Sequence, residues 1–198
     1  MTESYPLPND RKRLKKHIFL LGVSGAGKSR MGKALAEDIK LPFIDHDHEF
    51  KERFGKIGEF QEREGIKITD QALIDLVTDM LEKENQAVIS ISPRVTPSKV
   101  VWEKLASSGY SFFLHTLPMH IHKRANITVG DPSIDHPFVP ATDEERFLQE
   151  CKYDFYYYYF WRTSSANNAD YFIPCEGEFY KDYDYLHRKV ESVLAKKQ

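Results

Sequence analysis

The sequence predicts an α/β fold, with a parallel sheet covered by helices on both faces. Short apolar runs of strand length alternate along the chain with longer segments whose apolar residues follow helical spacing. This order is typical of strands joined by crossover helices, which give a parallel sheet. A glycine-rich segment at 22–29 lies between the first apolar run and the first helical segment, where such a fold turns from strand to helix.

Length and charge limit the classes of function. With 198 residues and 41% hydrophobic content, the chain is long enough for one domain of ordinary size. The 28 Lys and Arg residues balance 30 Asp and Glu residues, so no overall field attracts nucleic acid or an anionic membrane. Residues 1–16 are polar and contain a basic run, so we expect a flexible basic arm followed by a single domain over 17–198.

Cysteine usage favours a cytoplasmic location. Cys151 and Cys175 lack CxxC spacing and a secretory context, which favours reduced thiols. The apolar run that starts at His17 is too short to span a membrane. We therefore expect a cytoplasmic chain with no nucleic-acid or membrane partner, present as a monomer or weak homodimer.

Apolar runs and turn residues predict five strands, in chain order at 18–21, 43–44, 87–91, 110–114 and 171–173. Helical spacing predicts helices at 29–39, 72–81, 100–106, 118–124 and 180–194. Asp70 is placed to cap the second of these helices. The stretch 126–142 contains one glycine and three prolines and follows neither period, so we expect it to form a lid.

Residues Gly22–Ser29 match the pattern GxxxxGK[ST] in the strand–loop–helix context that it requires. Glycines let backbone N–H groups turn inward around phosphates, and the helix N-terminus adds partial positive charge. Lys28 is expected to reach the β- and γ-phosphates of a nucleoside triphosphate, and Ser29 to offer its hydroxyl to Mg²⁺. A P-loop NTPase fold that binds ATP and Mg²⁺ is therefore predicted. The expected nucleotide contacts from this segment are Gly22, Gly25, Ala26, Gly27, Lys28, Ser29 and Arg30.

Two carboxylates follow the second predicted strand. Asp45 and Asp47 come after Phe43-Ile44, and the carboxyl ends of parallel strands are where ligands bind. In an extended segment the two side chains would point the same way, with the histidines at 46 and 48 on the opposite side. Asp45 could then steady Mg²⁺ while Asp47 accepts a hydroxyl proton. Two turn-forming aspartates are the alternative, which the phosphate loop makes the weaker one.

The segment from His17 to Phe54 resembles the shikimate kinase family, whose members pair this phosphate loop with an IDxD segment at the same spacing, here Ile44-Asp45-His46-Asp47. The likeness extends more weakly to residue 195. The resemblance implies a nucleoside-monophosphate-kinase-like fold with a five-stranded parallel sheet, flanking helices and a lid. It also implies transfer of the ATP γ-phosphoryl group to a ring hydroxyl, with Asp47 as the candidate base. By position, Arg124 would lie near adenine and phosphates and act in catalysis, and Pro174 would lie in the adenine-side loop.

The acceptor side departs from the family's pattern. Ser92-Pro93-Arg94 stands where the family has a Gly-Gly-Gly turn, and its carboxylate-binding arginine is replaced near Asp70. His136 and Lys152 stand at two further arginine positions, and lysine or histidine offers a carboxylate a different geometry. Arg94 could bind an acidic group of the acceptor from a different side than the family's arginines, or it could be a solvated loop residue. The expected acceptor contacts are Asp47, Ser92, Arg94, His136 and Lys152.

These observations favour an ATP-dependent kinase that phosphorylates a hydroxyl of a small polyhydroxylated acid or cyclitol, with shikimate or a shikimate-like compound as the leading candidate. Two alternatives stay open. The loop spelling GVSGAGKS is very similar to that of gluconate kinases, whose substrate is also a hydroxy acid. The altered acceptor side also suits a catalytically weak nucleotide-binding regulatory protein derived from a shikimate kinase.

Overall fold

The computed structural model describes residues 17–83, 85–121 and 168–195, which contain a five-stranded sheet. All neighbouring strands are parallel, and the strand order is β2-β3-β1-β4-β5, so β1 lies at the centre. The five-stranded parallel sheet predicted from the sequence is therefore confirmed. The strands are β1 (His17–Leu21), β2 (Phe43–Asp45), β3 (Val88–Ser90), β4 (Gly109–Thr116) and β5 (Tyr171–Cys175).

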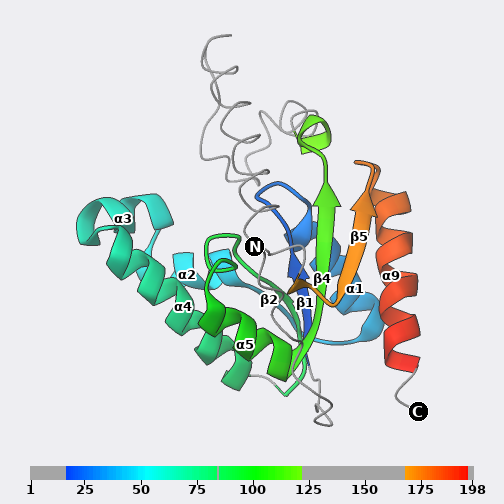
Figure 1. Ribbon diagram of the computed structural model, residues 1–198, viewed down its shortest axis with the longest axis horizontal. Helices are drawn as coiled ribbons and strands as arrows, with labels where there is room; N and C mark the ends of the chain where they lie inside the picture. Colours follow the sequence, from blue (N-terminus) through cyan, green and yellow to red (C-terminus); the bar gives the residue numbers. More distant parts are fainter. Residues whose placement is uncertain (1–16, 84, 122–167, 196–198) are drawn as a thin grey trace, which may run out of the picture.

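Helices connect and cover these strands (Figure 1). They are α1 (Lys28–Ile39), α2 (His46–Phe54), α3 (Ile57–Glu64), α4 (Ile66–Lys83), α5 (Lys99–Ser108) and α9 (Phe179–Ala195). Sequence periodicity does not predict α2 and α3, because these short, charged helices bury only three residues between them: His46, Phe50 and Phe60. The predicted capping role of Asp70 is wrong, since α4 begins at Ile66 and Asp70 lies inside it.

Two hydrophobic clusters lie on opposite faces of the sheet. Because side chains alternate along a strand, Ile18 and Leu20 of β1 belong to one cluster, and Phe19 and Leu21 to the other. The first cluster packs α1 and α9 against the sheet, and the second packs α2, α3, α4 and α5. Figure 1 shows α4 and α5 on one side of the strands and α9 beside β5 on the other.

One glycine brings α1 close to the sheet. A Cβ atom at Gly32 would lie 2.4 Å from Cε2 of Phe43 and 3.2 Å from Cδ1 of Leu20. Any larger residue would push α1 away from β2. The absence of a side chain at Gly32 therefore lets α1, which carries candidate site residues at its start, pack closely on Phe43 of β2 and Leu20 of β1.

Several sequence predictions fall outside the described residues. They are the arm at 1–16, the lid at 126–142, and residues Arg124, His136 and Lys152. The helix predicted at 118–124 is described only for 118–121, which is helical. Over the parts of the chain that the structure describes, none of the helices has the length and apolar character needed to cross a membrane.

Candidate active site

The phosphate loop joins the central strand β1 to α1, at the carboxyl edge of the sheet. Gly22, Gly25 and Gly27 have φ values of 145°, 77° and 98°, which residues with a Cβ rarely adopt. Gly27 occupies the N-cap position of α1 and has no side chain to cap the first turn. The N–H groups at this helix end therefore face the position of an anion that the loop would enclose.

Lys28 is buried within this loop. Its Nζ donates hydrogen bonds to the carbonyl oxygens of Gly22 and Val23, both at 3.0 Å. Burial lowers the pKa of Lys28, whereas the negative charges of Asp47 and Asp45 act in the opposite direction. The lysine of the phosphate loop and both candidate carboxylates therefore share one electrostatic environment, as phosphoryl transfer requires.

Asp45 links the phosphate loop to α2. Its Oδ2 accepts a short hydrogen bond from the Ser29 hydroxyl, and its Oδ1 accepts from the backbone N–H groups of Asp47 and His48 at 3.1 and 3.3 Å. Asp45 is therefore the N-cap of α2. Ser29 Oγ and Asp45 Oδ2 are adjacent hard oxygen atoms, the ligand type that Mg²⁺ prefers alongside phosphate oxygens and water.

The expected extended geometry is confirmed at Asp45, which ends β2, but it is wrong from His46 onward. The chain enters α2 at His46, so Asp47 lies in the first turn of a helix and not on a strand. The two residues remain linked, because the Asp45 side chain binds the Asp47 backbone and both carboxylates act on Lys28. Asp47 is exposed, which leaves its carboxylate accessible to a substrate hydroxyl.

His46 is a site residue whose role the sequence does not reveal. Its ring is fully buried, with Nε2 2.9 Å from the Leu73 carbonyl oxygen and Nδ1 accepting from the Ser92 N–H at 3.3 Å. These partners assign the proton to Nε2, because a carbonyl only accepts and an amide N–H only donates. Burial lowers the pKa of His46, while Asp47, the Leu73 carbonyl and Asp45 raise it, so the neutral ring is favoured.

The segment Ser92-Pro93-Arg94 follows β3, which lies between β2 and β1. It therefore begins beside both the Asp45 segment and the phosphate loop. Arg94 Nη2 lies 2.8 Å from Oδ1 of Asp70, and the two side chains are 32% and 48% exposed. Ser92 is buried. Arg94 therefore pairs with Asp70, which lies in the segment of α4 where the family resemblance predicts a carboxylate-binding arginine.

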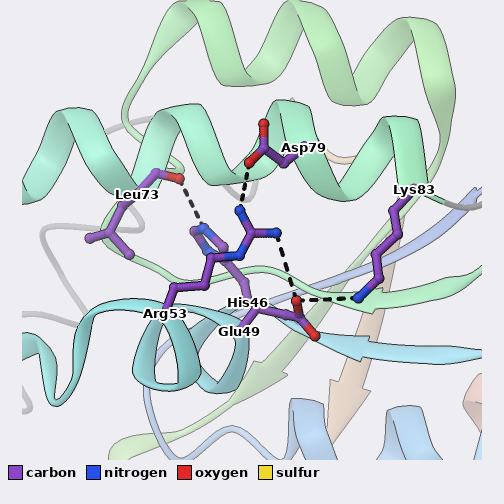
Figure 2. A network of polar contacts seen from close by, with 6 residues as sticks. All are labelled: His46, Glu49, Arg53, Leu73, Asp79 and Lys83. Atoms are coloured by element: carbon purple, nitrogen blue, oxygen red, sulfur yellow. Dashed lines mark hydrogen bonds and ion pairs between the residues drawn. The ribbon is translucent and has the colours of Figure 1, made fainter.

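A network of charged side chains holds α2 on α4 (Figure 2). Arg53 Nη1 of α2 lies 2.6 Å from Asp79 Oδ2 of α4, and Lys83 Nζ of α4 lies 3.5 Å from Glu49 Oε2 of α2. Arg53 Nη2 also lies 3.9 Å from the same Glu49 oxygen. Figure 2 shows these contacts beside the His46 ring, which points from α2 toward Leu73. The helix that carries Asp47 is therefore attached to the helix that carries Asp70.

The predicted adenine side lies near α9. The guanidinium of Arg30 stacks over the Phe179 ring at 4.0 Å from its centroid. Pro174 is exposed, but it lies within β5, so its predicted loop position is wrong. The Asp182 carboxylate accepts from the backbone N–H groups of Glu176 and Gly177 at 2.8 and 3.0 Å, which fixes the turn after β5. The Arg30 side chain therefore contacts the start of α9, next to this turn.

Comparison with protein families identifies the family of the chain. The family model described as shikimate kinase matches residues 24–171, which is most of the chain. The chain belongs to the shikimate kinase family. The shikimate kinase of Pseudoalteromonas atlantica is 32% identical over 139 residues, covering 68% of this chain and 76% of that protein. That of Legionella pneumophila (strain Corby) is 42% identical over 105 residues, covering 51% and 58%.

Solved shikimate kinases also have this fold. The structure from Bacteroides thetaiotaomicron has a TM-score of 0.69 at 25% identity and covers 91% of this chain and 98% of that one. The structure from Acinetobacter baumannii in complex with shikimate has a TM-score of 0.71 at 19% identity, with 94% and 96% covered. These similarities confirm the predicted P-loop, nucleoside-monophosphate-kinase-like fold. As a member of the shikimate kinase family, the chain is a phosphotransferase with a hydroxyl acceptor.

Proposed function

We propose that this chain is a Mg²⁺- and ATP-dependent kinase that phosphorylates a hydroxyl group of shikimate or of a closely related polyhydroxylated acid or cyclitol. One observation carries the proposal. The phosphate loop and the two carboxylates at the start of α2 form a single polar site, because Ser29 donates to Asp45 and both Asp45 and Asp47 act on buried Lys28. A nucleotide phosphate and an acceptor hydroxyl would meet between these groups.

Each residue has a chemical task in this proposal. The N–H groups of the phosphate loop and Lys28 would bind the β- and γ-phosphates and stabilise charge that develops on the transferred group. Ser29 and Asp45 would hold Mg²⁺, which neutralises phosphate charge when bound. Asp47 would accept the proton of the attacking hydroxyl, since its carboxylate is exposed beside the phosphate loop.

The nucleotide base and the acceptor would occupy opposite ends of the site. Pro174 and Arg124 are proposed to contact the adenine side, together with Arg30, whose stacking on Phe179 places it near the turn after β5. Ser92 and Arg94 are proposed to contact the acceptor, along with His136 and Lys152. Arg94 supports an acidic acceptor because its planar, always charged guanidinium can bind a carboxylate through two hydrogen bonds.

The names of the relatives indicate which acceptor compound to test first. The curated relatives are shikimate kinases, and the Acinetobacter baumannii enzyme holds shikimate in its solved structure. A gluconokinase from Sinorhizobium meliloti has the same fold, with a TM-score of 0.57 at 20% identity over 94% of this chain and all of that one. A likeness at that level supports the fold alone, so gluconate enters as a test compound and not as the preferred acceptor.

The decisive experiment measures ADP release from Mg-ATP with shikimate, quinate, myo-inositol and D-gluconate. We expect shikimate to stimulate ADP release most, and a Lys28→Ala protein supplies the background rate. Strongest stimulation by gluconate would replace shikimate with a sugar acid as the acceptor. ATP binding without stimulation by any compound would favour the regulatory alternative. Chelating Mg²⁺ with EDTA should abolish the stimulated rate.

The proposal also covers assembly and location. We propose a monomer or weak homodimer in the cytoplasm, acting on small molecules. Sedimentation analysis across a hundredfold range of protein concentration measures the first property. Fractionation of cells that express the chain measures the second.

A further inference from the structure

The fully buried side chain of His46 binds two segments outside its own helix. Its Nε2 and Nδ1 have partners that lie 27 and 46 residues away in sequence, in α4 and in the loop after β3. Figure 2 shows the ring directed from α2 toward Leu73. A buried polar ring is costly unless its nitrogens are satisfied, so the two bonds stabilise this particular arrangement of three segments.

The two hydrogen bonds differ in what their loss would cost. Leu73 lies inside α4, where a carbonyl already accepts an N–H bond from the next helical turn. Loss of the imidazole would therefore leave the Leu73 carbonyl with a hydrogen-bond partner. Ser92 is buried and follows the end of β3, and His46 accepts its N–H. Loss of that acceptor would leave a buried donor unsatisfied, which is the more expensive change.

A second contact ties the same loop to α4. Arg94 binds Asp70, which lies on α4 three residues before Leu73. The loop is thus attached through its first residue to His46 and through its third to Asp70. Helix α2 is in turn held on α4 by the Arg53–Asp79 ion pair. Among these linking residues, His46 is the one that lies between Asp45 and Asp47 in the sequence.

We propose that His46 is a positioning residue that fixes the Ser92-Pro93-Arg94 loop relative to Asp45 and Asp47. The inference rests on the proposed function, because that function assigns the loop to the acceptor and Asp47 to the hydroxyl proton. Through the hydrogen bond at Nδ1, the ring determines the position of the acceptor-side loop relative to the two carboxylates. Its effect should fall on acceptor binding and alignment, and leave ATP binding unchanged.

Two substitutions separate the ring's contacts. In His46→Asn the amide oxygen can take the place of Nδ1 and still accept from Ser92. In His46→Gln the longer amide can reach the Leu73 carbonyl, but the acceptor for Ser92 is lost. We expect the shikimate KM to rise roughly tenfold or more in His46→Gln, the scale of an unsatisfied buried donor, with the ATP KM unchanged. His46→Asn should stay close to wild type.

The exposed neighbour His48 supplies the matched controls. His48→Asn and His48→Gln replace a histidine two residues further along α2. The backbone N–H of His48 binds Asp45, and this bond does not depend on the side chain. Both controls should leave the shikimate and ATP KM values unchanged. Equal KM changes for shikimate and ATP in His46→Gln, or equal effects of the two His46 variants, would overturn the proposal.

Hydrogen exchange of the Ser92 amide tests the linkage without any acceptor. In the full chain, we expect this amide to exchange faster in His46→Gln than in wild type or His46→Asn, because only the first variant loses its acceptor. Identical exchange in all three proteins would also overturn the proposal. If wild type phosphorylates no compound of the panel, the proposed function fails, and the exchange rates still decide whether His46 holds the loop.

Discussion

The hydroxyl of Ser29 donates a hydrogen bond to the Asp45 carboxylate, although Ser29 follows β1, Asp45 ends β2, and β3 lies between these two strands. The contact therefore bridges the edge of the sheet across an intervening strand. Asp45 uses its other oxygen to cap α2. Asp45 thus caps α2 and is also the proposed magnesium ligand, and substitutions can separate these two roles.

Asp45→Asn should impair magnesium use while preserving the fold. Asparagine caps a helix about as well as aspartate, but it lacks the negative charge that favours Mg²⁺. We expect a higher Mg²⁺ concentration for half-maximal turnover, and little change in the free energy of unfolding. Asp45→Ala should show both effects, with a cap loss of about 0.5–2 kcal/mol. A magnesium titration and a denaturant titration measure the two quantities, and an unaltered magnesium requirement in Asp45→Asn would remove Asp45 from the metal site.

Lys28→Ala should reduce kcat/KM for ATP by roughly 10²–10³-fold, as expected when one preorganised electrostatic partner of a transition state is removed. Lys33→Ala is the matched control, because Lys33 is exposed on the same helix. Steady-state kinetics at saturating acceptor would measure both variants. Equal activities of the two variants would contradict the assignment of Lys28 to the phosphates.

Asp47→Asn should slow phosphoryl transfer by a factor on the order of 10²–10⁴, the usual contribution of a general base. ATP binding should be retained, because the amide keeps the size of the side chain and Asp47 lies in α2 and outside the phosphate loop. Single-turnover measurement of product formation, alongside nucleotide titration, separates these effects. Glu52→Gln, an exposed substitution on the same helix, should be neutral. Normal transfer by Asp47→Asn would exclude Asp47 as the base.

Arg94→Ala should raise the acceptor KM more than the ATP KM, by about tenfold or more if the guanidinium binds an acidic group. The Arg94–Asp70 pair is partly exposed, so its loss should change the free energy of unfolding by only about 0–1 kcal/mol. Asp70→Asn keeps the guanidinium and should raise the acceptor KM less. Parallel increases in both KM values would show that Arg94 does not select the acceptor.

The stability of the chain should depend on pH through His115. Burial lowers the pKa of this histidine in the folded state, so the unfolded state binds the proton more readily. The stabilising effect is therefore complete above the ordinary pKa of about 6.5 and is lost as the pH falls below it. His115→Phe keeps an aromatic ring against Phe172 and removes the titration. Denaturant titrations between pH 5 and 7.5 should show a smaller pH dependence for the variant.

The sequence predicts the parallel sheet and the position of the phosphate loop, because strand burial and glycine spacing are local signals. It does not predict α2, since a helix that buries only His46 and Phe50 has too narrow an apolar face to recognise. That omission explains the error at Asp47, which was expected on an extended segment with Asp45 and lies in α2 instead. The links of Ser92 to His46 and of Arg94 to Asp70 join distant segments, and no local pattern encodes such pairings.

The two hydrophobic clusters on opposite faces of the sheet give the protein separable halves for evolution and for engineering. Lys28 and Ser29 begin a helix of one cluster, whereas Asp47 and Asp70 belong to helices of the other. Free-energy effects of core substitutions far apart in the two clusters should add, because such sites share no partners, whereas Lys28 and Ser29 are coupled to Asp45 and Asp47 at the edge of the sheet. During evolution, a protein of this family could therefore change its acceptor substrate and retain its nucleotide substrate. The same separation makes residues 66–73 and 92–94 the natural targets for directing this scaffold to a new hydroxy compound.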